Sequence, residues 1–308
     1  MRTFEPFAKT NQAKLSGIQS VFQLRLSVIV MLLFSCMSSL LSIGQTTNQY
    51  GFSTSNTASL VLDRNSNTVN MGTGTTQLIG SSQDDVASSV TNIGFNFTFM
   101  GTAYTQFSVS SNGGIRLGGS AISSTTIGTD FPVSNQAILA PYLQDIETHS
   151  SGKIHYKLIG TSPNRTLVIE FLSMRINFNS NSNDATFQAR LYETTNIIEY
   201  VYGAMSVGST SSASSNNANA RTAVIGFSNT TGANNQISVN QSTYATSISG
   251  TPNTNTNSST GNITGLNSAS DGSRRSFTFT PPTVQTSAIS GSPFCAGEAI
   301  SVPFTSVG

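Results

Sequence analysis

Apolar side chains recur at every second position along much of the chain after Tyr50, with polar side chains between them. Because successive side chains of a strand point to opposite faces of a sheet, this period predicts half-buried β-strands. The apolar positions that alternate in this way include Phe95, Phe97, Phe99, Phe107, Val109, Ile115, Leu117, Ile154, Tyr156 and Leu158. Residues 167–172 carry apolar side chains toward both faces, which predicts a central strand that is covered on both sides.

Two short polar segments predict hairpin turns. Asn112-Gly113 joins two of the alternating segments, and both residues tolerate the positive φ of a tight turn. Residues 193–196 read Glu-Thr-Thr-Asn and lie between the alternating segments at 187–191 and 198–202. A polar segment of this length between two such strands predicts a second hairpin.

Short strands separated by Gly, Asn and Ser dominate the rest of the pattern. Residues 223–228 and 277–280 are further predicted strands. Pro281-Pro282 ends the unit, because proline cannot donate a hydrogen bond to a sheet. This pattern, with no amphipathic helix in it, predicts an all-β fold: a jelly-roll-like β-sandwich over residues 50–282.

Three segments differ in composition from the predicted strands. Residues 206–220 and 250–272 are rich in Ser, Thr, Asn and Gly. They are expected to be solvated loops, with ligand-binding loops at one end of the sandwich as the alternative. Residues 283–308 follow the two prolines and return to apolar alternation near their end, so we expect a linker and the first strands of a truncated second β module.

The N-terminal residues 1–44 have the order of a signal peptide. Residues 26–43 form an uncharged, strongly apolar run that follows a polar stretch with basic residues. This order predicts export and cleavage before Gln45. A permanent membrane anchor and a lipoprotein attached through Cys36 are the alternatives, but no basic stop-transfer cluster follows the run. The predicted location is therefore secreted or extracellular at the cell surface.

Charge excludes several classes of partner. Charged residues make up 9% of the chain, whereas an ordinary soluble domain has about 25%. Removal of residues 1–44, with four basic residues and one acid, leaves 10 Lys and Arg against 12 Asp and Glu. A chain so close to neutral has no basic surface for nucleic acid or for an anionic membrane. We therefore expect neither nucleic acid nor, after cleavage, a membrane as partner.

Motifs for catalysis are missing from the sequence. It contains no G-x-S-x-G elbow, no H-E-x-x-H, no C-x-x-C and no Walker loop. We therefore predict no enzyme activity, no cofactor, no catalytic residues and no metal ligands, and the ligand-binding residues stay unassigned. After cleavage Cys295 has no second cysteine in this sequence, and we expect its partner to lie beyond residue 308.

A few acids and both histidines are candidate ligands of a metal site. Asp145, Glu147 and His149 alternate along one predicted strand, so they share a face, and His155 is a possible fourth ligand. The favoured interpretation is a polar outer face beside a turn. A glycosidase acid pair could be drawn from Asp84-Asp85, Asp145 and Glu147, but no two of these acids stand out.

The sequence also contains candidate residues for a calcium site and for a sugar-binding site. Residues 63–67 and 179–184 are rich in side-chain oxygens. The first segment lacks the glycine and the final acid of a calcium loop, and the second is more typical of a hairpin loop. A sugar platform needs exposed aromatic rings. The candidates are Tyr142, Tyr192, Tyr200 and Tyr202, of which the last two share a face with Ile198 and are expected in the core.

Several segments resemble a known family when they are taken together. Residues 94–118, 138–146, 163–171 and 189–203 look, in this order, like the large β domain near the N-terminus of secreted surface proteins of the type IX export system. Residues 276–282 are similar to the end of that domain, and residues 291–306 resemble the first strands of an Ig-like module. The resemblance implies a multidomain exported protein with a C-terminal sorting domain. In the segment 138–146, where it implies an aromatic residue and paired acids, this chain has Tyr-Leu-Gln-Asp.

These observations favour a non-enzymatic module of an exported cell-surface or secreted protein, which serves display, adhesion or matrix contact. Its partner is expected to be an extracellular protein or a glycan, whose identity the sequence leaves open. The alternatives are a carbohydrate-binding, lectin-like domain and an accessory domain of a secreted hydrolase. Strand order and oligomeric state are also left open.

Overall fold

The computed structural model describes residues 49–176, 185–207, 221–229, 235–249 and 274–286, with short stretches at 254–257, 261–262, 265–266 and 304–307. The predicted signal peptide, Cys295 and residues 179–184 lie outside the described residues, as does most of the two low-complexity segments. Residues 1–44 and 45–308 form separate units, and the described strands all lie in the second unit. None of the helices among the described residues is long and apolar enough to cross a membrane.

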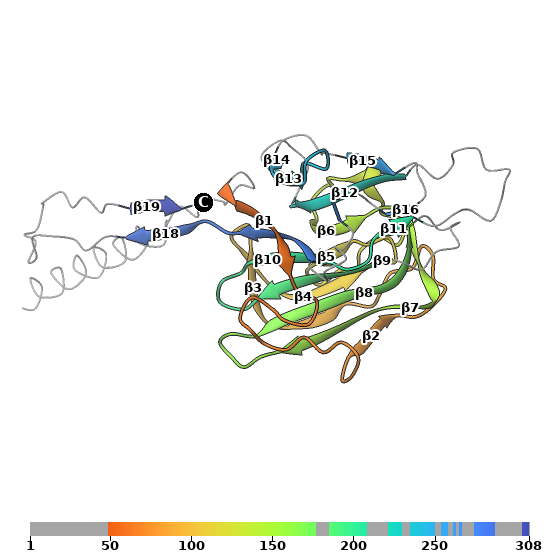
Figure 1. Cartoon of the computed structure of the whole chain (residues 1–308). Helices are drawn as coiled ribbons and strands as arrows, with labels where there is room; N and C mark the ends of the chain where they lie inside the picture. The colour runs from red at the N-terminus through yellow and green to blue at the C-terminus, as the bar shows by residue number, and fades with distance from the viewer. Residues whose placement is uncertain are drawn as a thin grey trace, which may run out of the picture. The chain divides into compact units, whose positions relative to one another are not determined.

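One antiparallel sheet contains seven strands (Figure 1). Their order across the sheet is β1 (Gly51–Ala58), β17 (Arg274–Thr280), β10 (Ile198–Tyr202), β9 (Ala185–Tyr192), β8 (Thr166–Ile176), β7 (Ile146–Ile159) and β2 (Thr76–Ile79). β8 lies between β9 and β7, in agreement with the central strand predicted for residues 167–172. The predicted hairpin at 193–196 joins β9 to β10.

The other large sheet is also antiparallel. Its order is β14 (Ser247–Ser249), β13 (Gln236–Val239), β12 (Arg221–Ser228), β6 (Ala137–Leu143), β5 (Ile115–Leu117), β4 (Thr102–Val109) and β3 (Thr91–Phe99), and β15 (Thr254–Asn257) pairs with β12 outside this path. Smaller elements are the 3-10 turn η2 (Gly128–Asp130) and the pairs β11 (Ser206–Val207) with β16 (Gly261–Asn262) and β18 (Thr283–Thr286) with β19 (Phe304–Val307).

The main hydrophobic core lies between the two large sheets. Its buried members are the inward-facing residues of both sheets, as the alternation predicted for Phe97, Phe107 and Ile154. Aromatic rings meet across the interface: the centroids of Phe227 on β12 and Phe279 on β17 are 5.1 Å apart, edge to face, a favourable geometry for aromatic pairs. Two antiparallel sheets that pack face to face over one core form a β-sandwich, which confirms the predicted all-β class.

The Asn112-Gly113 turn joins β4 to β5, as predicted. Gly113 has a φ of 80°, and a Cβ atom built on it would lie 2.1 Å from the carbonyl oxygen of Tyr142. Any residue larger than glycine would therefore collide with the backbone of the neighbouring segment. This close approach brings the tip of the β4–β5 hairpin against the end of β6.

Two tyrosine hydroxyls link the sheets across the core. The hydroxyl of Tyr200 donates to the carbonyl of Gly226 over 2.7 Å, and that of Tyr202 donates to the carbonyl of Pro141. Both acceptors lie where the register of β12 on β6 shifts, between Val224 and Gly226. Burial raises the pKa of both tyrosines well above the usual value, so the hydroxyls stay protonated and act as donors.

Substitution of either tyrosine by phenylalanine tests these links. Tyr200→Phe or Tyr202→Phe leaves a buried carbonyl without its donor, which costs about 1–3 kcal/mol. We expect each to lower the free energy of unfolding by this amount in urea titrations. Tyr156→Phe is the control, because Tyr156 is only partly buried at the edge of the core. Equal effects at all three positions would contradict the assignment.

Candidate functional site

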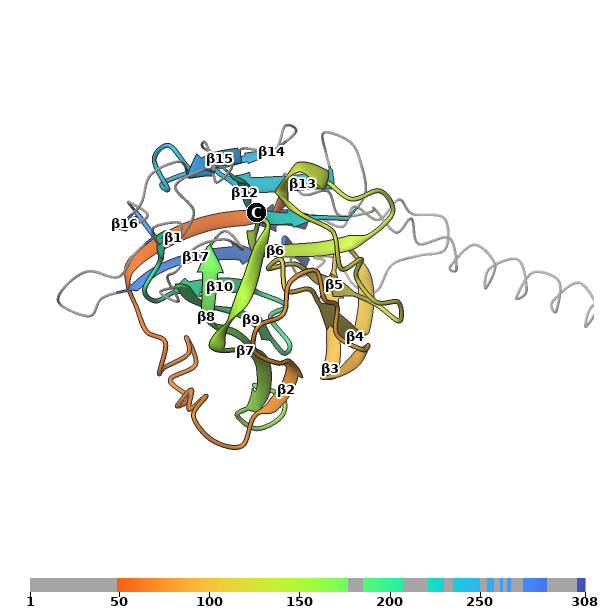
Figure 2. The ribbon, with the colours of Figure 1, turned by 90° about the vertical axis from the view of Figure 1, so that its right-hand side faces the viewer.

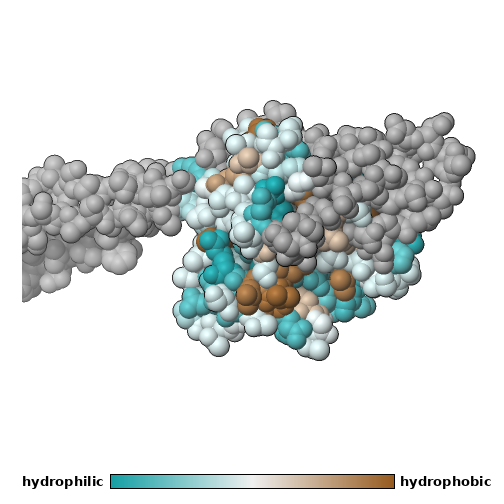
Figure 3. All heavy atoms as spheres, viewed as in Figure 1, coloured by the Kyte–Doolittle hydropathy of each residue, from teal (hydrophilic) through white to brown (hydrophobic). Residues whose placement is uncertain are grey.

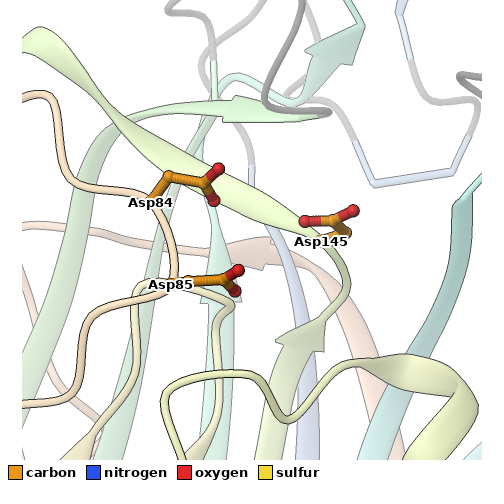
Figure 4. A group of neighbouring side chains, drawn as sticks. All are labelled: Asp84, Asp85 and Asp145. Atoms are coloured by element: carbon orange, nitrogen blue, oxygen red, sulfur yellow. The ribbon is translucent and has the colours of Figure 1, made fainter.

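Three acids from two distant parts of the chain meet at one end of the sandwich. Asp84 and Asp85 lie in the loop between β2 and β3, and Asp145 lies in the bend between β6 and β7. One carboxylate oxygen from each lies within 4.8 Å of the others, and Figure 4 shows the carboxylates converging. The sequence singles out no pair among these acids, since residues 60 positions apart carry no local sign of contact.

The tip of the β4–β5 hairpin holds this acid cluster in place. The side-chain nitrogen of Asn112 donates to Asp85 over 2.9 Å and to the carbonyl of Ser124 over 3.0 Å. Its side-chain oxygen accepts from the amide of Ile146 over 3.2 Å, and its carbonyl accepts from the amide of Gln144 over 3.1 Å. Asn112 therefore ties the loop that carries Asp85 to both residues that flank Asp145.

Like charges repel in the acid cluster. Partial desolvation, and then the charges of Asp85, Asp145 and Glu147, raise the pKa of Asp84 to about 6. Glu147 is also paired with Arg175, and it is the last of these charges in the size of its effect. Such a site can keep a proton on Asp84 in mild acid, or reduce its repulsion by holding a cation. Carboxylate oxygens are ligands that Ca²⁺ accepts, although Ca²⁺ takes six to eight oxygens, more than three side chains supply alone.

The metal set weighed from the sequence is not assembled. Asp145 joins the acid cluster, whereas Glu147 lies on β7 and pairs with Arg175 on β8. The ring of His149 contacts the hydroxyls of Ser150 and Ser151, both at 3.2 Å. The pairing of β7 with β8 shifts register just after Thr148. The three residues that alternate in sequence therefore have different partners instead of one shared site.

His155 was expected on a polar outer face, but it is completely buried. Its Nε2 lies 2.9 Å from a carboxylate oxygen of Glu170, and its Nδ1 lies 2.9 Å from the hydroxyl of Thr75. The second oxygen of Glu170 accepts from Gln188 over 2.7 Å. Residues 59–75 between β1 and β2, here called the strap, cover this face, and Figure 2 follows them in orange from β1 to β2.

Arg190 continues this polar row beneath the strap and is 1% exposed. Its guanidinium donates to the carbonyls of Ser59 over 2.6 Å and of Leu62 over 2.8 Å. On the sheet it donates to the side-chain oxygen of Gln188 over 2.6 Å and lies 3.4 Å from a carboxylate oxygen of Glu199. A buried charge requires such partners. The row, defined as His155, Glu170, Gln188, Arg190 and Glu199, therefore anchors the strap.

The sugar candidates are not available at the surface. All four tyrosines weighed from the sequence are fully buried; they are Tyr142, Tyr192, Tyr200 and Tyr202. The prediction that Tyr200 and Tyr202 belong to the core is confirmed, and the idea of Tyr142 or Tyr192 as an exposed platform is wrong. The hydroxyl of Tyr192 donates to Glu199 over 2.6 Å, so Tyr192 supports the polar row at Glu199.

Asp63 likewise serves the strap rather than a calcium loop. Its carboxylate accepts hydrogen bonds from the amides of Asn65 and Asn67, from the side chain of Asn67 and from the hydroxyl of Thr166, at 2.8–3.0 Å. These donors occupy both oxygens and fix a tight turn. Thr166 lies on β8, so the last of these bonds also joins the turn to the sheet.

Residues 60–281 match the family of NIDO-related domains. The chain belongs to the NIDO-related family. This family is an extracellular type of domain. The matched range of the NIDO-related domain holds most of the strap, the polar row and the acid cluster. No curated protein and no solved structure matches the chain.

The acid cluster predicts a pH dependence of stability. The folded-state pKa of Asp84 is raised above its unfolded value, so its stabilising contribution is complete below pH 3.8 and is lost as the pH rises through about 6. Asp84→Asn removes this repulsion and should therefore raise the free energy of unfolding at pH 7.5. The gain should not exceed about 1 kcal/mol, because solvent screens exposed charges. Urea titrations at pH 4 should show no such gain. An equal gain at both pH values would contradict the repulsion.

The polar row predicts a large loss when its cation is removed. Arg190→Met leaves Glu199 buried without its guanidinium and the strap carbonyls without donors, so unfolding should become easier by about 3–5 kcal/mol. The double variant Arg190→Met/Glu199→Gln should recover part of this loss, because the uncompensated charge is gone. A single-variant loss below about 1 kcal/mol in urea titrations would contradict the anchoring role.

Proposed function

We propose that this NIDO-related domain is a non-catalytic module of an exported cell-surface or secreted protein, and that it serves display, adhesion or matrix contact. The observation that carries the proposal is membership of a family of extracellular type. The partner in this proposal is an extracellular protein or a glycan. The N-terminal signal peptide of residues 1–44 supplies the route out of the cell.

The use of the charged side chains supports a scaffold role. Both ring nitrogens of His155 contact side chains that hold the strap and the sheet together. Arg190 binds both Glu199 and the carbonyls of the strap, and Arg165 pairs with Glu193 over 2.5 Å. Groups that catalysis commonly uses thus stabilise the fold here, as a rigid display module requires.

The finer part of the proposal concerns the export route and the rest of the protein. The order of the segments at 94–118, 138–146, 163–171 and 189–203 supports type IX export. Residues 291–306 support an Ig-like module after the sandwich; they lie outside the described residues except for residues 304–306. In this proposal the sandwich is the first of several extracellular modules.

Cell fractionation tests the location. In the organism that makes the protein, we expect the mature chain in the medium or on the cell surface, with Gln45 as its first residue by mass spectrometry. Val30→Arg/Leu33→Arg interrupts the apolar run and should keep the chain inside at full length, because the run no longer inserts. A wild-type chain that stays in the cytoplasm with Met1 would contradict the proposal.

Binding and turnover assays separate the functions. The mature chain from the medium should bind extracellular matrix proteins or glycans and should leave chromogenic glycosides and peptides unchanged. Binding on glycan arrays, with and without Ca²⁺, would identify a lectin. Hydrolysis of these glycosides or peptides by the purified chain would contradict the non-catalytic role. Asp84→Asn/Asp85→Asn tells whether the acid cluster takes part in binding.

A further inference from the structure

The strap is fixed to the sheet mainly through polar groups. Arg190 and Gln188 donate to three of its carbonyls, those of Ser59, Leu60 and Leu62, over 2.6–3.3 Å. Further along, the hydroxyl of Thr166 donates to Asp63, and His155 contacts Thr75. Lys157 donates to the carbonyls of Asn70 and Thr73 over 3.0 and 2.8 Å. Water can replace each of these hydrogen bonds when the strap moves away, so their net contribution is small.

Apolar contacts of the strap are few and separate from the main core. Val69 and Met71 form a small cluster with Ile159 and Val168. All residues of the strap are described, and none of them belongs to the buried core between the sheets. The hydrophobic effect, which dominates the stability of the sandwich, therefore contributes little to holding the strap down.

The first part of the strap, residues 59–62, has an inverted polarity. Its carbonyls point inward to Arg190 and Gln188, and its apolar side chains Val61 and Leu62 point to solvent, where they are 63% and 48% exposed. Figure 3 shows hydrophobic surface where the segment between β1 and β2 lies in Figure 1. This part of the strap buries polar groups and exposes apolar ones, so it gains little free energy from being closed.

We propose that the strap is a lid that opens while the sandwich stays folded, and that its opening uncovers the polar row from His155 to Glu199. The sandwich keeps its own core when the strap leaves, because that core contains no strap residue. Opening also returns water to Arg190, Glu170 and Glu199, which reduces the desolvation penalty of buried charges. Segments with few buried apolar contacts are the ones that open separately in native proteins.

Native-state amide hydrogen exchange in increasing urea tests the lid. The amides of Asp63, Ser66 and Val69 form hydrogen bonds inside the strap, and a detached hairpin of this size does not hold such bonds. These amides should exchange at least 100-fold faster, relative to intrinsic rates, than the amides of β8 and β9. Their exchange should also depend little on urea, because opening the strap exposes little surface.

Two variants distinguish opening from global unfolding. Thr166→Val removes one strap-to-sheet hydrogen bond and should speed the exchange of strap and β8–β9 amides alike, about fivefold. Ile225→Val trims the main core and should speed only the β8–β9 amides, also about fivefold, because strap opening leaves the core intact. If Ile225→Val speeds both sets equally, or if both sets share one urea dependence, the strap opens only when the whole domain unfolds and the proposal is overturned.

Discussion

A guanidinium that is almost completely buried determines how the strap lies on the seven-stranded sheet of this domain. Arg190 lies in the middle of the seven-stranded sheet on the side away from the core, where a charge needs acceptors on every side. The sheet supplies two of them through Gln188 and Glu199, and the strap supplies two more through backbone carbonyls. The path of residues 59–62 across the sheet follows from this requirement, since the carbonyls of Ser59 and Leu62 must face the guanidinium.

Two polar regions of the domain differ in their charge balance. In the polar row, each side chain from His155 to Glu199 contacts the next one, and the row holds the strap and the sheet together. In the acid cluster, Asp84, Asp85 and Asp145 repel one another at the exposed end of the sandwich. The first region suits a structural role and the second suits contact with something outside the molecule. This division agrees with the proposal of a non-catalytic extracellular module.

The sequence predicts the framework well because strand periodicity is a local signal. The alternation around Phe97 and Phe107 and the Asn112-Gly113 turn predicted β3, β4 and β5, and the doubly apolar residues 167–172 predicted the central position of β8. Periodicity tells which side chains share a face, but it cannot tell whether another segment covers that face. For this reason His155 was expected at the surface and is buried beneath the strap. The acid cluster was out of reach for a similar reason, because Asn112 brings together loops that no local pattern connects.

The most direct test of the account is an NMR measurement of the Arg190 side chain in the uniformly ¹⁵N-labelled mature chain. A guanidinium held by four acceptors should give separate, slowly exchanging Nε and Nη proton signals at neutral pH, with cross-relaxation to Ser59 and Leu62 of the strap. These signals would show that the guanidinium of Arg190 lies beneath the strap and is held there by its acceptors. A single averaged signal that exchanges as fast as that of a free arginine would show that the strap does not rest on Arg190 and would contradict the account.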